Sequence, residues 1–318
     1  MTLARFTAGR VASGAIFALV VASLTMALAR VVPTAELEDL ARTPEALAAR
    51  RAELGLDRPF LDQYSRWLGG LARLDFGRST RFQRPVRELL VERAMHTAIL
   101  AIAALAVATV LGPSLGRRAG AAPDGIGRWI RAASLAMLSL PPLLSSLVLV
   151  FLAARTGWLP AGGMTTGGLS GAAWIADVLR HLPVPALALG LPMAATLERL
   201  QARAMREALT RPFVTASLAR GLDRHAAARV HAWPVSLAPV LGAYGVLVGS
   251  LFSGSFVVEL VTGWPGLGLL LFDALNARDV WLVAGCGAAG AVSLAVGITL
   301  ADVVHAAIDP RVLEARRS

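Results

Sequence analysis

The sequence has one cysteine and no lysine, and it also lacks the common patterns of nucleotide and metal sites. Because Cys286 is the only cysteine in 318 residues, an intrachain disulfide and a cysteine-based metal cluster are excluded. No GxxxxGK[ST], HExxH or CxxC pattern is present, so we expect no cofactor on this chain and no ATP site of the usual kind. Charged residues make up only 16% of the chain and hydrophobic residues 56%, with a mean hydropathy of +0.61. Several apolar runs approach the ~20 residues that a transmembrane helix needs, which excludes an ordinary soluble protein.

The net charge of +10 comes entirely from arginine. A basic chain raises the possibility of nucleic-acid binding. Here the arginines stand in short connections between apolar runs, which the positive-inside rule explains better. The sequence therefore predicts lipid, and no nucleic acid, as its surroundings.

The apolar runs predict an all-α polytopic membrane protein with about six transmembrane helices and both termini in the cytoplasm. Pro141 and Pro142 should kink the third run. The first run, with Met26–Ala29 resembling a cleavage site, also fits a signal peptide, but its length favours a helix that stays in the protein. The spans contain few ionisable groups, which predicts a pathway without a tight solute site. The six runs are Val11–Ala29, Ala94–Gly116, Ala132–Ala154, His181–Leu197, Pro234–Val258 and Val280–Ala301.

We divide the chain into residues 1–32 (cytoplasmic start and first span), 33–93 (an extracytoplasmic helical segment), 94–311 (five-helix core) and 312–318 (cytoplasmic tail). Within 33–93 we expect one helix over Pro44–Leu54 and another from Pro59. The second has an apolar face that packs on its own domain, on the membrane surface or on a partner: Phe60, Tyr64, Trp67, Leu68 and Leu71. In the fifth span, Gly245 and Gly249, and Ser250 and Gly254, have the small-xxx-small spacing of close helix packing.

Residues 199–233 form a basic loop with seven arginines between Arg199 and Arg229, and we predict a cytoplasmic helix-turn-helix inside it. Pro212 suits the first turn of a short helix, and Gly221 suits the left-handed residue that ends it. Asp223 suits the N-cap of a second helix running to about Val230. Small residues are expected to be exposed for a close partner: Ala216, Ser217 and Ala219 on the first helix, and Ala226, Ala227 and Ala228 on the second.

This loop resembles the EAA-type loop of permease subunits of ABC importers, in the dipeptide, oligopeptide and nickel branch. The family pattern is close to YVRTARAKGL followed by HALRNALIP. Trp233 and Pro234 depart from it, standing where the family has Leu and Arg. The matching residues are Phe213, Val214, Ala219, Arg220, Gly221, Leu222, His231, Ala232, Leu237 and Pro239.

The resemblance extends over roughly residues 40–312. Leu54–Ser79 and Pro85–Arg93 are similar to the family's extracytoplasmic signature, and GWLPAGG follows the third span as in the family. The most specific motif is WPGLG with a downstream Arg-Asp pair, which gives as outer motif residues Trp264, Pro265, Gly266, Gly268, Arg278 and Asp279.

The resemblance implies a non-enzymatic permease subunit that moves peptides, nickel complexes or similar small solutes across the inner membrane. It also implies a second homologous permease, two ATPase subunits that bind the ATP, and an extracytoplasmic solute-binding protein. The 212–231 loop would dock on an ATPase subunit. We expect the core of this contact to be Ala219, Arg220, Gly221, Leu222 and Asp223.

Two other functions remain open. An ion-coupled secondary transporter needs sites on broken helices near the midplane, and the proline-rich run His181–Leu197 is the candidate. Gly168–Gly171 resembles the GxSG of rhomboid-type intramembrane serine proteases, with Ser170 as nucleophile and His305 as the partner histidine. Ser170 lies in an outer connection and His305 at the opposite end of a span, which disfavours the protease.

Overall fold

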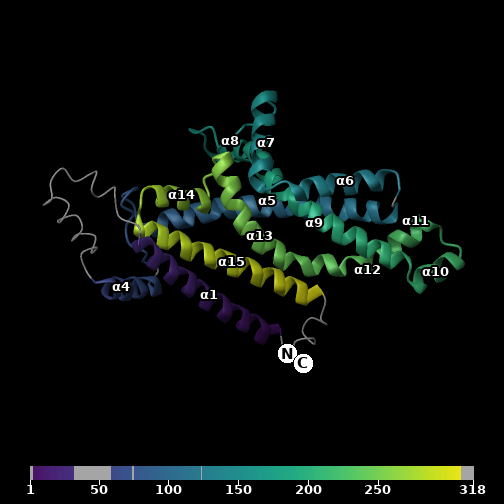
Figure 1. Ribbon diagram of the computed structural model, residues 1–318, viewed down its shortest axis with the longest axis horizontal. Helices are drawn as coiled ribbons and strands as arrows, with labels where there is room; N and C mark the ends of the chain where they lie inside the picture. Colours follow the sequence, from purple (N-terminus) through teal and green to yellow (C-terminus); the bar gives the residue numbers. More distant parts are fainter. Residues whose placement is uncertain (1–2, 32–58, 74, 123, 309–318) are drawn as a thin grey trace. The chain divides into compact units, whose positions relative to one another are not determined.

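The computed structural model describes residues 3–31, 59–73, 75–122 and 124–308. Within these ranges the chain is helical, and the only strand-like pairing is an isolated bridge between Arg78 and Pro85 (Figure 1). The expected all-α class is confirmed; the expected helix over Pro44–Leu54 lies outside the described residues. The helices are α1 (Leu3–Val31), α4 (Phe60–Ala72), α5 (Val86–Ala121), α6 (Ile126–Ser139), α7 (Pro142–Thr156), α8 (Gly171–His181), α9 (Pro183–Leu209), α10 (Pro212–Ala219), α11 (Arg224–Ala227), a π-helix (Ala228–Ala232), α12 (Trp233–Ser236), α13 (Ala238–Thr262), α14 (Leu267–Asn276) and α15 (Val280–Ile308).

Four helices of the described ranges are long and apolar enough to cross a membrane: Thr7–Ala27 within α1, α5, α13 and Val280–Ala306 within α15. Two bent pairs, α6 with α7 and α8 with α9, raise the number to six if each pair is one span. The predicted spans therefore all fall on apolar helices, and two of them are broken.

The break between α6 and α7 reaches 107°. Leu140 has an extended backbone with ψ 116°, as a residue before proline prefers. Pro141 and Pro142 supply no N–H to the preceding turn, and Pro142 opens α7 at its first turn. The expected kink is thus a complete break of the third span.

The connection before the fourth span differs from the prediction. Residues 171–180, which precede the predicted run His181–Leu197, form a helix with His181: this is α8, which meets α9 at a bend of 43°. Pro183 starts α9 at a position where its missing N–H is not needed. From there α9 continues well beyond the expected end at Leu197, to Leu209.

The chain divides into two compact units, residues 1–8, 98–264 and 297–318 (unit 1) and residues 9–97 and 265–296 (unit 2). In unit 1, α9 is the central helix and contacts α6, α7, α12 and α13 (Figure 1). Leu100, Leu197 and Trp264 are fully buried members of its largest apolar core. Most residues of α9 through Ala208 are buried, as expected for a helix surrounded by others.

Glycines of α5 form a second contact surface for α9, which we call the glycine seam: Gly112, Gly116 and Gly120, one helical turn apart. A Cβ atom on Gly112 would stand 2.6 Å from the Cβ of Leu197, and one on Gly116 would stand 2.6 Å from the Cβ of Gln201. These distances are too short for any side chain, so glycine at these positions allows the two helices to pack closely.

The pairs expected in the fifth span behave differently. A Cβ on Gly254 would lie 2.8 Å from Leu189, so this glycine does serve close packing within unit 1. A Cβ on Gly249 would have no described atom within 4 Å outside its own turn of the helix, so this glycine is not required for a close contact there. The sequence spacing alone could not separate a filled contact from an open one.

Unit 2 buries the apolar face of α4. Trp67 is 3% exposed and packs with Ala22 and Met26 of α1 and with Ala284 and Ala288 of α15. The hydroxyl groups of Tyr64 and Ser23 are 2.7 Å apart. The prediction that this face packs on its own domain is therefore confirmed for Tyr64, Trp67 and Leu71. Leu68, in contrast, is exposed. Cys286 is buried in the other apolar cluster of this unit, beside Leu282 and Val283.

Three acidic residues lie just beyond the ends of predicted apolar runs, on the same helices. α13 continues past Val258 to Thr262 and so includes Glu259, which is fully buried. α15 continues past Ala301 and includes Asp302. Glu198 of α9 is 1% exposed. The helices exceed the apolar runs because backbone hydrogen bonding continues where hydropathy falls.

Candidate functional site

The predicted helix-turn-helix is present in unit 1. Pro212 opens α10, and Gly221, just beyond its end, has φ +91°. The Leu222 N–H donates to Ser217 O over 3.2 Å, and the Gly221 N–H donates to Leu218 O over 2.9 Å. These two bonds form a Schellman motif, which needs a left-handed residue at the position of Gly221.

Asp223 caps α11, as predicted. Its Oδ1 accepts from the N–H groups of His225 over 2.7 Å and Ala226 over 2.9 Å. These bonds, that of Ala226 first, hold the pKa of Asp223 below its ordinary value. Thus Gly221 and Asp223 each have a local structural role in the turn, in addition to any contact with a partner.

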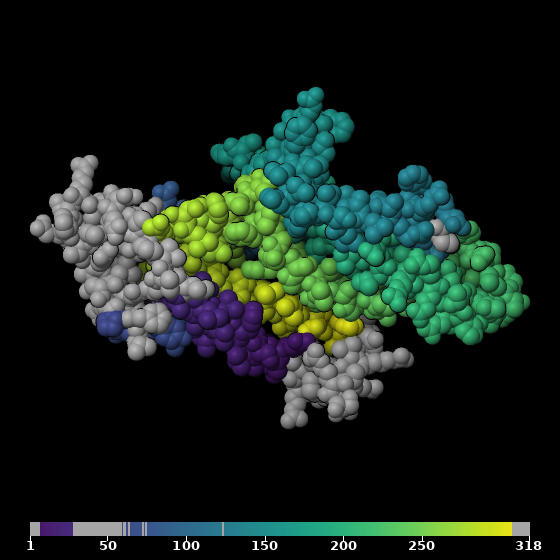
Figure 2. Space-filling model, viewed as in Figure 1, coloured from purple at the N-terminus to yellow at the C-terminus, as the bar shows by residue number. Residues whose placement is uncertain are grey.

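The exposed face of the loop is partly different from the one expected. Ser217 and Ala227 are fully buried, and the Ser217 hydroxyl donates to Val214 O over 2.7 Å. Ala216 and Ala219 are exposed as expected, and Phe213 and Leu218 add apolar surface at 40% and 39% exposure. Among the predicted docking residues Leu222 is half-buried, whereas Ala219, Arg220, Gly221 and Asp223 are exposed. Figure 2 shows the green atoms of this part of the chain uncovered in that view.

A small apolar cluster joins the loop to the end of α9. It contains residues of α9, α10, α11 and the π-helix: Met205, Ala208, Val214, Ala227 and Ala232. We call it the loop cluster. Ser217 and Ala227 are buried because the loop folds back on α9, a contact that local spacing does not reveal. The loop is therefore packed against the span that precedes it.

A π-helix replaces the last part of the second predicted helix. α11 ends at Ala227 rather than about Val230, and the Trp233 N–H donates to the carbonyl of Ala228, five residues earlier. Pro234 follows and has no N–H for the ordinary register. The guanidinium carbon of Arg117, on α5, lies 5.3 Å from the centre of the Trp233 ring. The junction between the loop and α12 is thus irregular and is held from α5 by a cation–π contact.

The outer motif is divided between the two units. In unit 1, Trp264 is fully buried, and its N–H donates to Glu259 O over 3.0 Å. Just before it, Gly263 ends α13 with φ +65°. The neighbouring GWLPAGG motif meets the same helix end, because the Gly163 N–H donates to Thr262 O over 2.8 Å. Two motifs that looked separate in the sequence therefore contact each other.

In unit 2 the motif is attached to α5. The Thr97 hydroxyl accepts from the Leu267 N–H over 2.8 Å and so caps α14 from a different helix. One residue earlier on α5, His96 Nδ1 donates to Pro265 O over 2.8 Å. Gly266 has an extended backbone as the N-cap of α14.

The C-terminal end of α14 carries the Arg-Asp pair, and Gly268 lies in the first turn of this helix. Arg278 has φ +51°, which is uncommon for a residue with a side chain. The Arg278 N–H donates to Leu275 O over 3.1 Å, and the Asp279 N–H donates to Ala274 O over 2.9 Å. This is a second Schellman motif, here with arginine in the position that glycine usually takes.

Asp279 is fully buried and binds residues that precede it by about 200 positions. Its Oδ2 accepts from the Ser79 hydroxyl over 2.6 Å and from the N–H groups of Thr80 over 2.7 Å and Arg81 over 3.2 Å. Its Oδ1 accepts from the Leu282 N–H over 3.1 Å, which caps α15. The Arg-Asp pair and the Leu54–Ser79 signature thus meet at one carboxylate.

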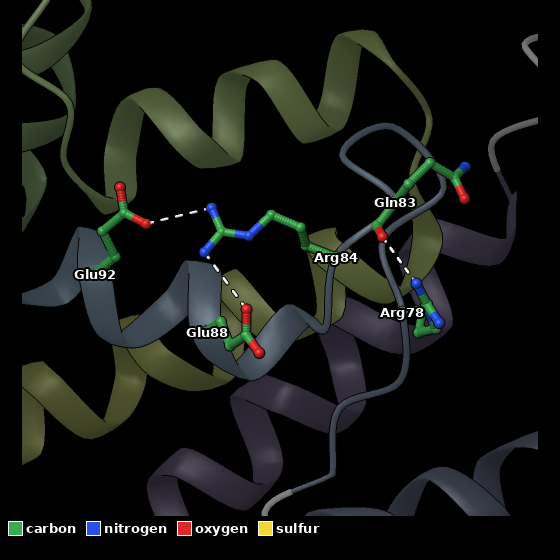
Figure 3. Close-up of polar contacts among 5 residues, drawn as sticks. All are labelled: Arg78, Gln83, Arg84, Glu88 and Glu92. Carbon is green, nitrogen blue, oxygen red and sulfur yellow. Dashed lines mark hydrogen bonds and ion pairs between the residues drawn. The ribbon is translucent and has the colours of Figure 1, made fainter.

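The turn that binds Asp279 continues into an exposed polar cluster at the start of α5 (Figure 3). Arg84 lies 3.5 Å from both Glu88 and Glu92, and the Arg78 guanidinium donates to Gln83 O over 2.9 Å. Exposed ion pairs at this distance contribute little stability. The buried Asp279 carboxylate is therefore the main polar anchor of this turn.

Sequence reasoning missed Ser79, Arg117 and Glu198. The four-residue spacing of Gly112, Gly116 and Gly120 was a readable signal for the glycine seam, but nothing in the sequence links Ser79 to Asp279. Ser170, the nucleophile of the protease alternative, is an exposed N-cap of α8. In the described chain no group of three or more His, Cys, Asp or Glu side chains could hold a metal ion.

Comparisons with known proteins identify the family. The family described as binding-protein-dependent transport system inner membrane component matches residues 108–314. A protein of Brucella ovis named as a peptide permease is 34% identical over 281 residues, 86% of each chain. The oligopeptide transport system permease proteins AppB of Bacillus subtilis and OppB of Mycobacterium tuberculosis are 31% and 32% identical. AppB aligns over 81% of this chain and 82% of its own, and OppB over 85% and 86%.

The matched stretch covers more than half of the chain and contains α9, the loop, α13 and all of α15. The apolar helices agree with a multi-pass membrane protein. The chain therefore belongs to the family of inner-membrane components of binding-protein-dependent transport systems, the permease subunits of ABC transporters.

Proposed function

We propose that this chain is a pore-forming subunit of an ATP-driven importer of peptides, and that residues 212–231 receive force from a separate ATPase subunit. The observation that carries the proposal is a capped helix-turn-helix that exposes Phe213, Ala216 and Ala219 and is fixed to α9 by the loop cluster. An exposed apolar face with small side chains suits a helix that docks in a groove. The names of AppB and OppB support peptides, rather than nickel complexes, as the solute class.

Three contacts provide a path from the loop into the membrane helices of unit 1. Force on α10 passes through Met205 and Val214 to the end of α9. It then reaches α5 through the glycine seam, where the α5 backbone contacts α9 directly and no α5 side chain lies between the two helices. It reaches α13 through the π-helix and α12. Because packed helices move as rigid bodies, docking at the loop favours one of two arrangements of these spans.

The remaining partners follow from the same assignment. A second homologous permease completes the pathway, two ATPase subunits hold the ATP, and an extracytoplasmic binding protein delivers the solute. With the loop in the cytoplasm, both termini are cytoplasmic, and Pro265–Asp279 and Arg78–Gln83 face outward. Labelling single cysteines in residues 212–230 from each side of the membrane tests this orientation; labelling from outside would refute it.

Gly221 offers a direct test of coupling. Gly221→Leu should greatly reduce the stimulation of ATP hydrolysis by binding protein and peptide in the reconstituted complex, because leucine strains the left-handed turn and covers the docking face. Gly168→Leu is the matched control, since Gly168 also has positive φ, +70° against +91°, and neither glycine has an atom within 4 Å of an added Cβ. Unchanged stimulation in Gly221→Leu, with the complex intact, would contradict the docking role.

A further inference from the structure

Glu198 is a buried acid without a visible partner. It is 1% exposed, and neither carboxylate oxygen has a hydrogen-bond partner among the residues that the structure describes. Gln201, one turn later on α9, is fully buried; its Nε2 donates to the Ser236 hydroxyl over 2.6 Å. Its Oε1, like the Glu198 oxygens, has no described partner. A buried carboxylate is stable only when a cation or hydrogen-bond donors compensate its charge, so this arrangement is an incomplete site.

The guanidinium group of Arg117 lies at the same contact between α5 and α9, but it binds the Trp233 ring instead of Glu198. Arg117 is half-buried near the cytoplasmic end of α5, and within the described ranges its polar contact is the face of the Trp233 ring, 5.3 Å away. Its neighbour Gly116 touches the backbone of Glu198, since a Cβ there would lie 2.6 Å from Glu198 O. Arg117 and Glu198 therefore stand on touching turns of α5 and α9, and arginine is the residue best suited to a paired buried carboxylate.

The current partner of Arg117 belongs to the loop that we assign to coupling. Trp233 follows the π-helix Ala228–Ala232, whose Ala232 is part of the loop cluster. A displacement of α10 and α11 therefore moves the tryptophan ring relative to α5. When the ring moves away, Arg117 loses a cation–π contact of moderate strength, and a buried carboxylate without a donor lies on the adjacent helix.

We propose that Arg117 exchanges partners during transport, binding the Trp233 ring in the arrangement described and the Glu198 carboxylate in the arrangement that ATPase docking favours. This inference rests on the proposed function, because docking supplies the movement of the loop. The exchange makes α5 and α9 bistable: one arrangement keeps the cation–π contact, and the other completes the buried ion pair. It also explains what Trp233, which departs from the family pattern, does in this chain: its ring binds Arg117.

Glu198→Gln tests the exchange. The uncharged amide removes an unpaired buried charge from the arrangement described, so the thermal unfolding temperature of the detergent-solubilised complex should rise. It also removes the ion pair of the other arrangement, so ATP hydrolysis stimulated by binding protein and a mixture of short peptides should fall by roughly tenfold, the ratio expected for one charge-assisted hydrogen bond. Trp233→Leu should act in the opposite direction and raise unstimulated hydrolysis several-fold. A purely structural role of Glu198 would not raise stability and lower stimulation together.

Two further variants decide whether Arg117 is the partner. Arg117→Glu combined with Glu198→Arg should restore most of the stimulation that Glu198→Arg alone removes. Arg118→Glu combined with Glu198→Arg is the matched control, because Arg118 is the exposed neighbour on the same helix, and it should restore nothing. If wild type shows stimulation, but Glu198→Gln retains it or the reversed pair fails to recover it, the exchange is refuted and the importer assignment stands. A wild-type complex without any stimulation would instead refute the proposed function.

Discussion

Replacing Asp279 by alanine removes the acceptor of four hydrogen bonds, from the Ser79 hydroxyl and from the N–H groups of Thr80, Arg81 and Leu282. The consequences differ among these donors. The Thr80 and Arg81 N–H groups are only partly buried, so water can replace the lost acceptor there. The Ser79 hydroxyl and the Leu282 N–H lose a buried acceptor, so the loss is concentrated at these two donors and in the capping of α15.

An unsatisfied buried donor costs about 1–3 kcal/mol. Loss of an N-cap costs about 0.5–2 kcal/mol. Together they predict that Asp279→Ala destabilises unit 2 by roughly 2–5 kcal/mol, with a fall in unfolding temperature of about 2–4 °C per kcal/mol for a chain of this size. Asp279→Asn keeps one acceptor oxygen and should lose less.

Thermal unfolding of the purified protein in detergent measures the effect. Asp75→Asn is the matched control, because Asp75 is an exposed carboxylate in the same segment that accepts from the Gly77 N–H over 3.0 Å. Ser79→Ala should add little in the Asp279→Ala background, since both remove the same contact. An unfolding temperature of Asp279→Ala within about 1 °C of wild type would refute the assignment of Asp279 as the anchor of the turn.

Three further predictions concern other contacts. Gly116→Ala should destabilise the protein by about 1–3 kcal/mol, because the new Cβ would lie 2.6 Å from atoms of α9. Gly69→Ala is the control and should not destabilise it, since a Cβ on Gly69 would have no atom within 4 Å. Equal unfolding temperatures of the two variants would contradict the glycine seam. Because the pKa of Asp223 in the folded protein is lowered from 3.8, its stabilising cap is fully present above pH 3.8 and is lost as the pH falls through the folded pKa. Hydrogen-exchange protection of the Ala226 amide should therefore decrease only below pH 3.8. Asp223→Asn should abolish this pH dependence. Thr97→Val removes the buried acceptor of the Leu267 N–H and should lower the unfolding temperature by several degrees, whereas Thr97→Ser should restore it.

Local chemistry was sufficient to predict several features of the fold. Pro212, Gly221 and Asp223 have the predicted roles because a missing N–H, a left-handed backbone and a capping carboxylate act within a few residues. The apolar runs likewise located every candidate span of the described residues. The broken third span followed from Pro141 and Pro142, although the extent of the break did not.

The remaining features depend on contacts between distant parts of the chain. The burial of Ser217 and Ala227 comes from packing on α9, and the anchoring of Ser79 comes from a residue 200 positions away. The π-helix reflects Pro234 together with the contacts that hold Trp233. Hydropathy also ended the fifth span at Val258, whereas helical hydrogen bonding carries α13 through Glu259 to Thr262.

The burial of Cys286, 3% exposed behind Leu282 and Val283, has a practical consequence. A polar maleimide dye should not react with Cys286 in the native chain, but it should react with a cysteine introduced at an accessible position. Fluorescent or spin probes can then be attached to the helix-turn-helix while every natural residue elsewhere in the protein is retained.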